Sequence, residues 1–451
     1  MECITYAAYD SDKEDWSLLT SLSSSPMSTR PPSPLNTTPQ SVNTQLTSTM
    51  PVASGATASS ASRDTKRKAM KRKSSHRNRK KKRDSAPMYH PNPIRASKHI
   101  QNAKPVYSTL QAKNFPIAST GYIGLQQKKS CRHYELNELV GPDSKFNFTL
   151  RKWDGMISMP LVDNKQRVIG ICAGVPDDDN TWPEVHGRAA ELLESARPHL
   201  LFDKKYKKHQ WGEYSALGVG ISHGGGQPYP KILSQDTRNE PILEELMKDK
   251  VFERISGFAT GAFAEWAPHL YNYQSDYLSR LIAHDQELCR TNCHPNPKEK
   301  ELRRNWPRTP WAAATFNFGP QTVCFKHADT GNLAFGWCAI TALGKYDHTK
   351  GGHLVLWDLG LVIEFPPGST ILIPSSAIHH SNVRIQPGER RYSFTQYSAG
   401  GIFRWVDHDF QKVDDYRGSL GPNDLAKICC KLSGQLSFGM SLYSTVAELE
   451  S

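Results

Sequence analysis

The chain has 451 residues, of which 37% are hydrophobic, so it is long enough for one large domain but too polar to be folded throughout. It contains no run of about 18 apolar residues, and its first residues are acidic, so we expect neither a membrane-spanning helix nor a secretory signal peptide. The nine cysteines lack the spacing of a disulfide framework, which indicates reduced thiols and an intracellular protein.

Residues 1–105 are rich in Ser, Thr, Pro and Lys and poor in aromatic residues, so we expect this region to be disordered. Within it, the segment 63–83 contains 13 Lys or Arg and one Asp. Its charge of +12 equals the net charge of the whole chain, so the remainder is balanced. Such a basic run predicts binding to the nuclear import machinery, hence a nuclear protein, and salt-sensitive contacts with DNA phosphates. The alternative is a solvated charge run without a partner.

Residues 120–310 predict a mixed region of strands and helices that supports the rest of the domain. A short strand is expected at 168–174 and a helix at about 187–196. The stretch 241–290 has the strongest helical pattern in the chain, and Pro241 is suited to a first helical turn. The helices therefore come before the strand-rich region rather than alternating with its strands.

From 311 to 410 the pattern changes to short β-rich runs separated by Gly, Pro and Asn, which is typical of an antiparallel sandwich or barrel. Because helices precede these strands, we predict an α+β fold with a jelly-roll (cupin-like) barrel buttressed by helices. In the C-terminal tail, 411–451, we expect a short helix from Asn423 or Asp424 and assign no function. The predicted strands are 314–318, 322–325, 336–343, 353–357, 362–365, 370–373 and 391–397.

A possible metal site begins with His327 and Asp329, two residues apart in a β-rich segment. That spacing puts both side chains on one face of a strand, where an imidazole nitrogen and a carboxylate oxygen can bind one ion. The His-x-acid pattern alone is common enough to occur by chance. Another instance, His133-Tyr-Glu135, is not completed by any downstream residue.

Downstream residues complete the first instance. His380 follows about fifty residues after Asp329, and Arg391 comes eleven residues after His380. Two histidines and one carboxylate leave three positions open on an octahedral ion, which is the arrangement of non-haem Fe(II) oxygenases. We therefore predict Fe(II), with 2-oxoglutarate at two open positions and dioxygen at the third. Arg391 would bind the far carboxylate of 2-oxoglutarate, and Ser393, on the same strand face, would add a hydrogen bond.

Two positions have a neighbour of the same type. His379 precedes His380, and only one of two adjacent strand residues can face the metal. Arg390 likewise competes with Arg391, which we prefer because only Arg391 has a serine two residues later.

The region from Trp311 to Phe410 resembles the catalytic domain of the Tet/JBP-like 2-oxoglutarate/Fe(II) dioxygenases that fungi carry in many copies, associated with Kyakuja-Dileera-Zisupton transposons. Similarities at 153–155 (WDG) and 222–227 (SHGGGQ) extend the resemblance to roughly 150–410. The matching stretches within the main region are 316–320 (FNFGP), 322–329 (TVCFKHAD), 332–343 (NLAFGWCAITAL), 351–358 (GGHLVLWD) and 392–397 (YSFTQY).

The resemblance implies a double-stranded β-helix, metal roles for His327, Asp329 and His380, and a 2-oxoglutarate role for Arg391. In the family the histidine directly precedes Ser-Asn, which favours His380. The implied substrate is the methyl group of 5-methylcytosine or thymine in DNA, and the base must leave the stack to react. The alternatives are a protein side-chain hydroxylase and a non-catalytic jelly roll that binds chromatin or transposon partners. The Cys-rich zinc module of animal Tet enzymes is absent from this sequence.

Overall fold

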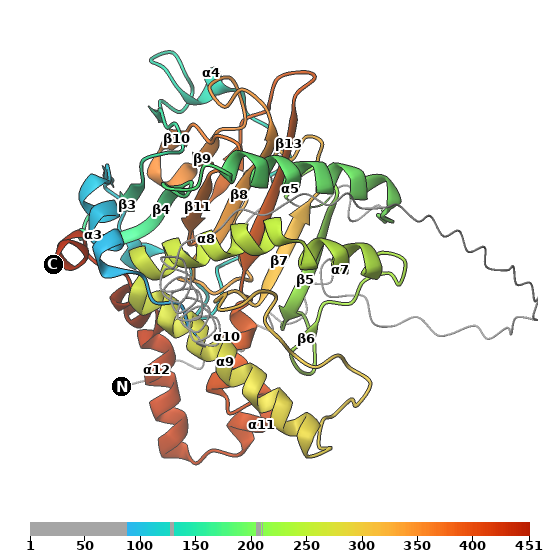
Figure 1. Ribbon diagram of the computed structural model, residues 1–451. Helices are drawn as coiled ribbons and strands as arrows, with labels where there is room; N and C mark the ends of the chain where they lie inside the picture. The colour runs from blue at the N-terminus through green and yellow to red at the C-terminus, as the bar shows by residue number, and fades with distance from the viewer. Residues whose placement is uncertain (1–87, 127–129, 204–208, 210) are drawn as a thin grey trace, which may run out of the picture. The chain divides into compact units, whose positions relative to one another are not determined.

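A computed structural model of the protein shows an α+β fold built on two β-sheets (Figure 1). Residues 1–87 lie outside the described residues, and with them the basic segment 63–83 and the part of the chain up to residue 87 that we expect to be disordered. The structure describes residues 88–451, with the exception of 127–129, 204–208 and 210.

The expectation of disorder is wrong for part of 88–105, where α3 (Pro93–Asn102) is a helix. Proline occupies its first turn, and the side chain of Asn92 caps it by accepting a hydrogen bond from the backbone nitrogen of Arg95 at 3.1 Å. His99 of this helix lies 2.8 Å from a carboxylate oxygen of Glu265. The composition of the segment is polar, so its order depends on such contacts with the rest of the chain.

Two sheets form the frame of the fold. The larger sheet has the strand order β1 (Val106–Tyr107), β3 (Met159–Val162), β4 (Val168–Gly174), β11 (Thr370–Ile373), β8 (Cys338–Lys345), β13 (Arg390–Tyr397), β7 (Ala313–Asn317), β5 (Ala216–Ser222), β6 (Lys231–Ile232). The smaller sheet has the order β12 (His380–Asn382), β9 (Leu354–Leu356), β10 (Leu361–Ile363), β2 (Thr149–Arg151).

The chain alternates between these sheets. After β8 in the larger sheet it forms β9 and β10 in the smaller, returns for β11, crosses to β12 and returns again for β13. Such winding between two sheets is that of a jelly roll. Strands from the preceding region, including β4 and β5, widen the larger sheet on both sides, so the predicted supporting region shares a sheet with the strands of 311–410.

The predicted strands in 311–410 correspond to β7, β8, β9, β10, β11 and β13, with ends shifted by no more than two residues. Among the described residues, the expected strand at 322–325 has instead one isolated bridge, between Gly212 and Cys324. The strand β12 lies outside the predicted ranges, although His379 and His380 were treated as strand residues. Its residues His380–Asn382 are polar, so no hydrophobic pattern marks it.

Hydrophobic side chains fill both faces of the larger sheet. Leu354 and Leu356 of the smaller sheet share one buried cluster with Ile371 and Ile373 of the larger, so these side chains join the two sheets. On the opposite face, aromatic residues such as Phe316 pack against helices that lie across the sheet in Figure 1. These helices are α5 (Trp182–Ala196), α7 (Glu240–Lys248) and α8 (Lys250–Trp266).

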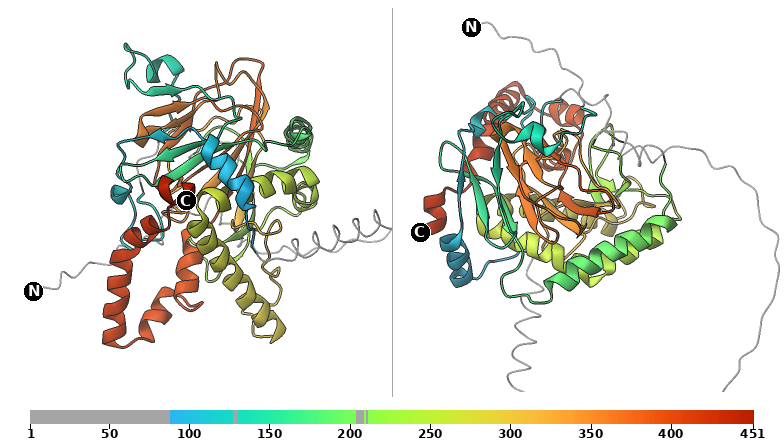
Figure 2. Two further views of the ribbon diagram at one scale, coloured as in Figure 1. Left: turned by 60° about the vertical axis from the view of Figure 1, so that its left-hand side comes forward. Right: turned by 90° about the horizontal axis from the view of Figure 1, so that it is seen from above.

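Leu139 of α4 (Leu136–Leu139) packs on the smaller sheet, and Figure 2 shows α9 (Pro268–Arg290) and α12 (Pro422–Ser441) extending beyond the same end of the sheets. Among the described residues, no helix is long and apolar enough to span a membrane. The remaining helices are α10 (Gly400–Asp407), α11 (Val413–Gly418) and α13 (Val446–Glu450).

The C-terminal tail packs against the core. The short helix expected from Asn423 or Asp424 is α12, which runs for 20 residues. Beyond it, Tyr443 is buried and its hydroxyl donates to the carbonyl oxygen of Phe335 at 2.8 Å. The backbone nitrogen of Val168 donates to the carbonyl of Ser444 at 2.8 Å, which ties the tail to the start of β4.

Candidate metal centre

The structure brings together the side chains of His327, Asp329 and His380. One potential ligand atom from each lies within 4.8 Å of the other two. The Nε2 atom of His327 is 3.5 Å from Oδ1 of Asp329, and Nε2 of His380 is 3.9 Å from Oδ2. Within the described part of the chain, no other group of His, Cys, Asp or Glu side chains satisfies the same criterion.

Backbone pairing sets the two histidines opposite each other. The backbone nitrogen of His327 donates to the carbonyl of His380 at 3.0 Å, and the nitrogen of His380 donates to the carbonyl of His327 at 2.8 Å. Residues paired in this way point to the same side, and the two ring centroids are 4.2 Å apart. The backbone nitrogen of Asp329 donates to the carbonyl of Ser375 at 2.9 Å, which anchors the third side chain.

The hydrogen bonds of both imidazoles fix their tautomers. Nδ1 of His327 lies 2.8 Å from the carbonyl oxygen of Phe325, and Nδ1 of His380 lies 3.0 Å from that of Ile378. A carbonyl oxygen can only accept, so each Nδ1 carries a proton, and in the neutral imidazole Nε2 then has the lone pair that binds a metal. This is the second-sphere arrangement that orients metal-binding histidines.

The electrostatics favour the protonation states that bind metals. Burial alone would raise the pKa of Asp329, but the hydrogen bond and charge of His327, together with the charge of His380, lower it to about 2. Burial, with a smaller contribution from the charge of His327, lowers the pKa of His380 to about 4. At neutral pH the carboxylate is therefore ionised and the His380 imidazole is neutral, as metal ligation requires.

His379 points elsewhere. Its Nδ1 lies 3.0 Å from Oδ2 of Asp358, and its backbone nitrogen donates to the same oxygen at 2.6 Å. Of the two adjacent histidines, only His380 lies beside Asp329. The sequence favoured His380 through the family resemblance, and a backbone bridge pairs His380 with His327.

Arg391 is a buried cation, with 1% of its surface exposed. Its Nη1 donates to the carbonyl of Thr322 at 2.6 Å, whereas its Nε has no hydrogen-bond partner among the described residues. The rings of Tyr346 and Phe365 flank the guanidinium, with centroids 5.9 and 5.7 Å from its central carbon. A guanidinium removed from water needs an anion to offset its desolvation, so this environment suits a carboxylate ligand.

Ser393 lies on the same face of β13 as Arg391, and its hydroxyl accepts a hydrogen bond from Nδ2 of Asn317 at 2.9 Å. Arg390 faces the other way. Its side chain is 59% exposed and its Nη1 lies 3.2 Å from a carboxylate oxygen of Glu194. The alternation of strand side chains thus separates the two arginines.

One residue of the centre was missed by the sequence analysis. The indole Nε1 of Trp211 donates to Oδ1 of Asp329 at 2.9 Å, across 118 residues of chain. No motif spacing links a tryptophan before β5 to a carboxylate after β7. Only the folded arrangement reveals this contact.

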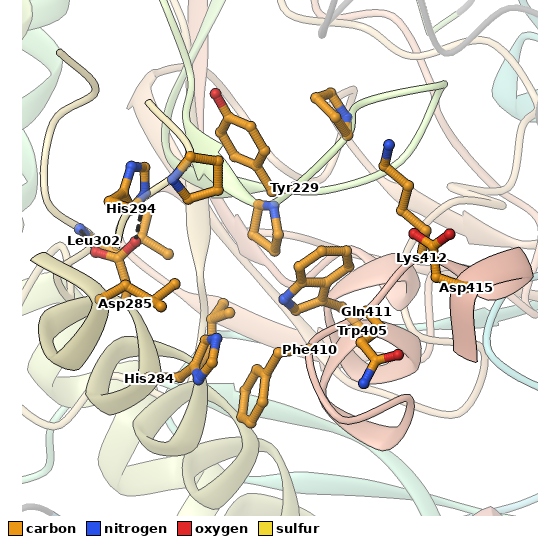
Figure 3. Close-up of a pocket in the computed structure, with 15 residues that line it drawn as sticks. Tyr229, His284, Asp285, His294, Leu302, Trp405, Phe410, Gln411, Lys412 and Asp415 are labelled. Carbon is orange, nitrogen blue, oxygen red and sulfur yellow. Dashed lines mark hydrogen bonds and ion pairs between the residues drawn. The ribbon is translucent and has the colours of Figure 1, made fainter. Parts of the chain in front are cut away.

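A hollow of about 410 Å³ lies apart from these ligands, between α9 and the residues after α10 (Figure 3). Its lining includes the rings of Tyr229, Trp405 and Phe410. The carboxylate of Asp285 in its wall already accepts from the backbone nitrogen of Leu302 and lies beside an imidazole nitrogen. The hollow is therefore mainly apolar and lacks the ligand set found around Asp329.

No protein-family model matches the chain, and no curated protein matches it. Among solved structures, it is similar to NgTET1 in complex with 5mC DNA, with 14% identity, a TM-score of 0.38, and coverage of 56% of this chain and 83% of the other. It is also similar to an oxidoreductase of the 2OG-Fe(II) oxygenase family from Burkholderia pseudomallei, with 16% identity, a TM-score of 0.22, and coverage of 41% and 66%. Because identity and TM-score are both low, the assignment that follows rests on the chain's own residues.

Proposed function

We propose that the chain is an Fe(II)- and 2-oxoglutarate-dependent dioxygenase with a double-stranded β-helix core. His327, Asp329 and His380 hold the iron in this proposal. Arg391 binds the far carboxylate of 2-oxoglutarate, and Ser393 assists it. The observation that carries the proposal is the meeting of two Nε2 atoms and a carboxylate within 4.8 Å.

The donor set fits the metal. Two imidazoles and one carboxylate leave three positions for a chelating co-substrate and dioxygen. When bound, these groups supply an oxidative decarboxylation that is coupled to hydroxylation of a C–H bond. The carbonyls of Phe325 and Ile378 hold the two imidazoles in the ligating tautomer. The buried guanidinium of Arg391 orients the co-substrate and neutralises its charge.

We further propose that the substrate is the methyl group of a modified base, 5-methylcytosine or thymine, in DNA. Support comes from the sequence resemblance over roughly 150–410 and from the basic segment 63–83, which offers salt-sensitive contacts to phosphates. A nuclear location, reached through the import machinery, follows from the same segment. The target base must leave the helical stack to reach a buried centre.

The test uses the full chain with Fe(II) and labelled 2-oxoglutarate, with and without methylated DNA, and follows the release of succinate. We expect methylated DNA to stimulate the release of succinate and His327→Ala to abolish it. Succinate release that DNA does not stimulate would exclude DNA as the substrate and favour hydroxylation of a protein side chain. Failure to bind iron would remove the enzymatic assignment altogether and favour a non-catalytic binding module.

A further inference from the structure

The carboxylate of Asp329 has a donor that belongs to neither the metal ligands nor the barrel strands. The indole Nε1 of Trp211 donates to Oδ1 at 2.9 Å. The second oxygen, Oδ2, lies 3.9 Å from Nε2 of His380, whereas Oδ1 lies 3.5 Å from Nε2 of His327. The two oxygens of one carboxylate therefore have different surroundings.

The segment that carries the indole is fixed to the barrel. The backbone nitrogen of Phe325 donates to the carbonyl of Trp211 at 2.8 Å, and Gly212 forms a bridge with Cys324. A side chain at Gly212 would approach the carbonyl oxygen of Val323 to 2.7 Å, so glycine permits this close approach. These backbone contacts hold the segment so that the indole of Trp211 lies against Asp329.

Aromatic packing holds the indole from its other side. The ring of His209 lies with its centroid 5.3 Å from that of Trp211 and 4.8 Å from that of Tyr214. The hydroxyl of Tyr214 lies 3.2 Å from Sγ of Cys324, which returns the segment to the same stretch of chain that supplies His327. The indole therefore has little freedom to turn away from the carboxylate.

We propose that Trp211 is a positioning residue that keeps Asp329 a one-oxygen ligand of the metal, an inference that rests on the proposed function. A carboxylate that binds through both oxygens takes two positions on an octahedral ion, which leaves two positions after the histidines. A chelating keto acid fills both, and dioxygen then has none. An indole N–H can only donate, so it occupies Oδ1 without competing for the metal and leaves Oδ2 as the ligand.

The test measures binding of Co(II), and then of 2-oxoglutarate to the Co(II)-loaded full chain, by calorimetry, together with the visible absorption of bound Co(II). Trp211→Phe keeps a ring but removes the donor, and Trp211→Gln restores an N–H of similar reach. Trp306→Phe is the matched control, because its indole donates to the carbonyl of Met247 at 3.1 Å, away from the site. Thermal unfolding of each variant checks that the fold is intact.

We expect Trp211→Phe to shift the visible absorption of bound Co(II), because Oδ1 is then free to become a second ligand atom. We expect Trp211→Gln to recover most of the wild-type absorption, and Trp306→Phe to match the wild type. A wild-type spectrum for Trp211→Phe, or an equal shift in Trp211→Gln, would overturn the inference. His327→Ala separates the two levels: if it binds Co(II) normally the proposed function fails, whereas if it loses Co(II) binding and Trp211→Phe keeps the wild-type spectrum, only the role of Trp211 fails.

Discussion

Two adjacent arginines on β13 have opposite surroundings, which makes them a matched pair for testing the co-substrate site. Arg391 is buried beside two aromatic rings, and its Nε has no partner in the part of the chain that the structure describes, whereas Arg390 is on the surface beside Glu194. Lysine keeps the charge of arginine but loses its planar pair of donors. We expect Arg391→Lys to raise the KM for 2-oxoglutarate about 10- to 100-fold, with a smaller effect on metal affinity.

Arg390→Lys is the control and should change the KM less than about twofold, since a surface ion pair contributes little. The measurement is the rate of succinate release as a function of 2-oxoglutarate concentration. Equal KM values for the two variants would remove Arg391 from the co-substrate site.

At the scale of residues, the sequence indicated which side chains come together but not which contacts hold them. The spacing of His327, Asp329 and His380 was readable because the strand period and the ligand chemistry constrain it. The choice between His379 and His380 was not readable from spacing, because it depends on a backbone bridge between distant residues. Trp211 was not predictable at all, since its hydrogen bond spans 118 residues without a motif.

At the scale of elements, the same substitution to alanine has opposite expected effects on stability at two glycines of α12. A Cβ at Gly439 would clash with the ring of Phe335, which is fully buried and cannot move aside. A Cβ at Gly434 would meet nothing within 4 Å. We expect Gly439→Ala to lower the free energy of unfolding by about 1–3 kcal/mol through overpacking.

Gly434→Ala should instead raise the free energy of unfolding by roughly 0.5–1 kcal/mol, because alanine loses less backbone entropy in a helix. Chemical denaturation followed by circular dichroism measures both. Destabilisation by the two variants to the same extent would show that α12 does not pack on Phe335 as described.

Elements with a hydrophobic pattern were predictable, and those held by polar contacts were not. The strand β11 was predicted with its observed bounds because three of its four residues are apolar and all four are buried. The three polar residues of β12 carry no such pattern. The order of α3 and the packing of the tail around Tyr443 depend on partners far along the chain, which local composition does not report.

At the scale of the whole molecule, several buried histidines make stability depend on pH. Burial lowers the pKa of His353 and of His408 to about 4 and the pKa of His223 to about 3. The charge of Arg404 contributes to the lowered pKa of His408 and of His223. Between pH 6.5 and these values the unfolded chain binds protons that the folded chain does not. Acidification through this range therefore favours unfolding.

We expect the free energy of unfolding to be highest near neutral pH and to fall below pH 6.5, by on the order of 1 kcal/mol per pH unit for each such histidine. Denaturant titrations at pH 7.5, 6 and 5 measure this slope, and His408→Asn should reduce it. A free energy that is constant between pH 7 and 5 would contradict the burial of neutral imidazoles.

The most direct test of the central claim is anaerobic Fe(II) binding by the full chain in the presence of 2-oxoglutarate, compared among the wild type, His379→Ala and His380→Ala. The two variants remove the same side chain from adjacent positions, but only His380 lies beside Asp329. We expect one equivalent of iron in the wild type and in His379→Ala, and loss of that binding in His380→Ala. Normal iron binding by His380→Ala, or its loss in His379→Ala alone, would contradict the account.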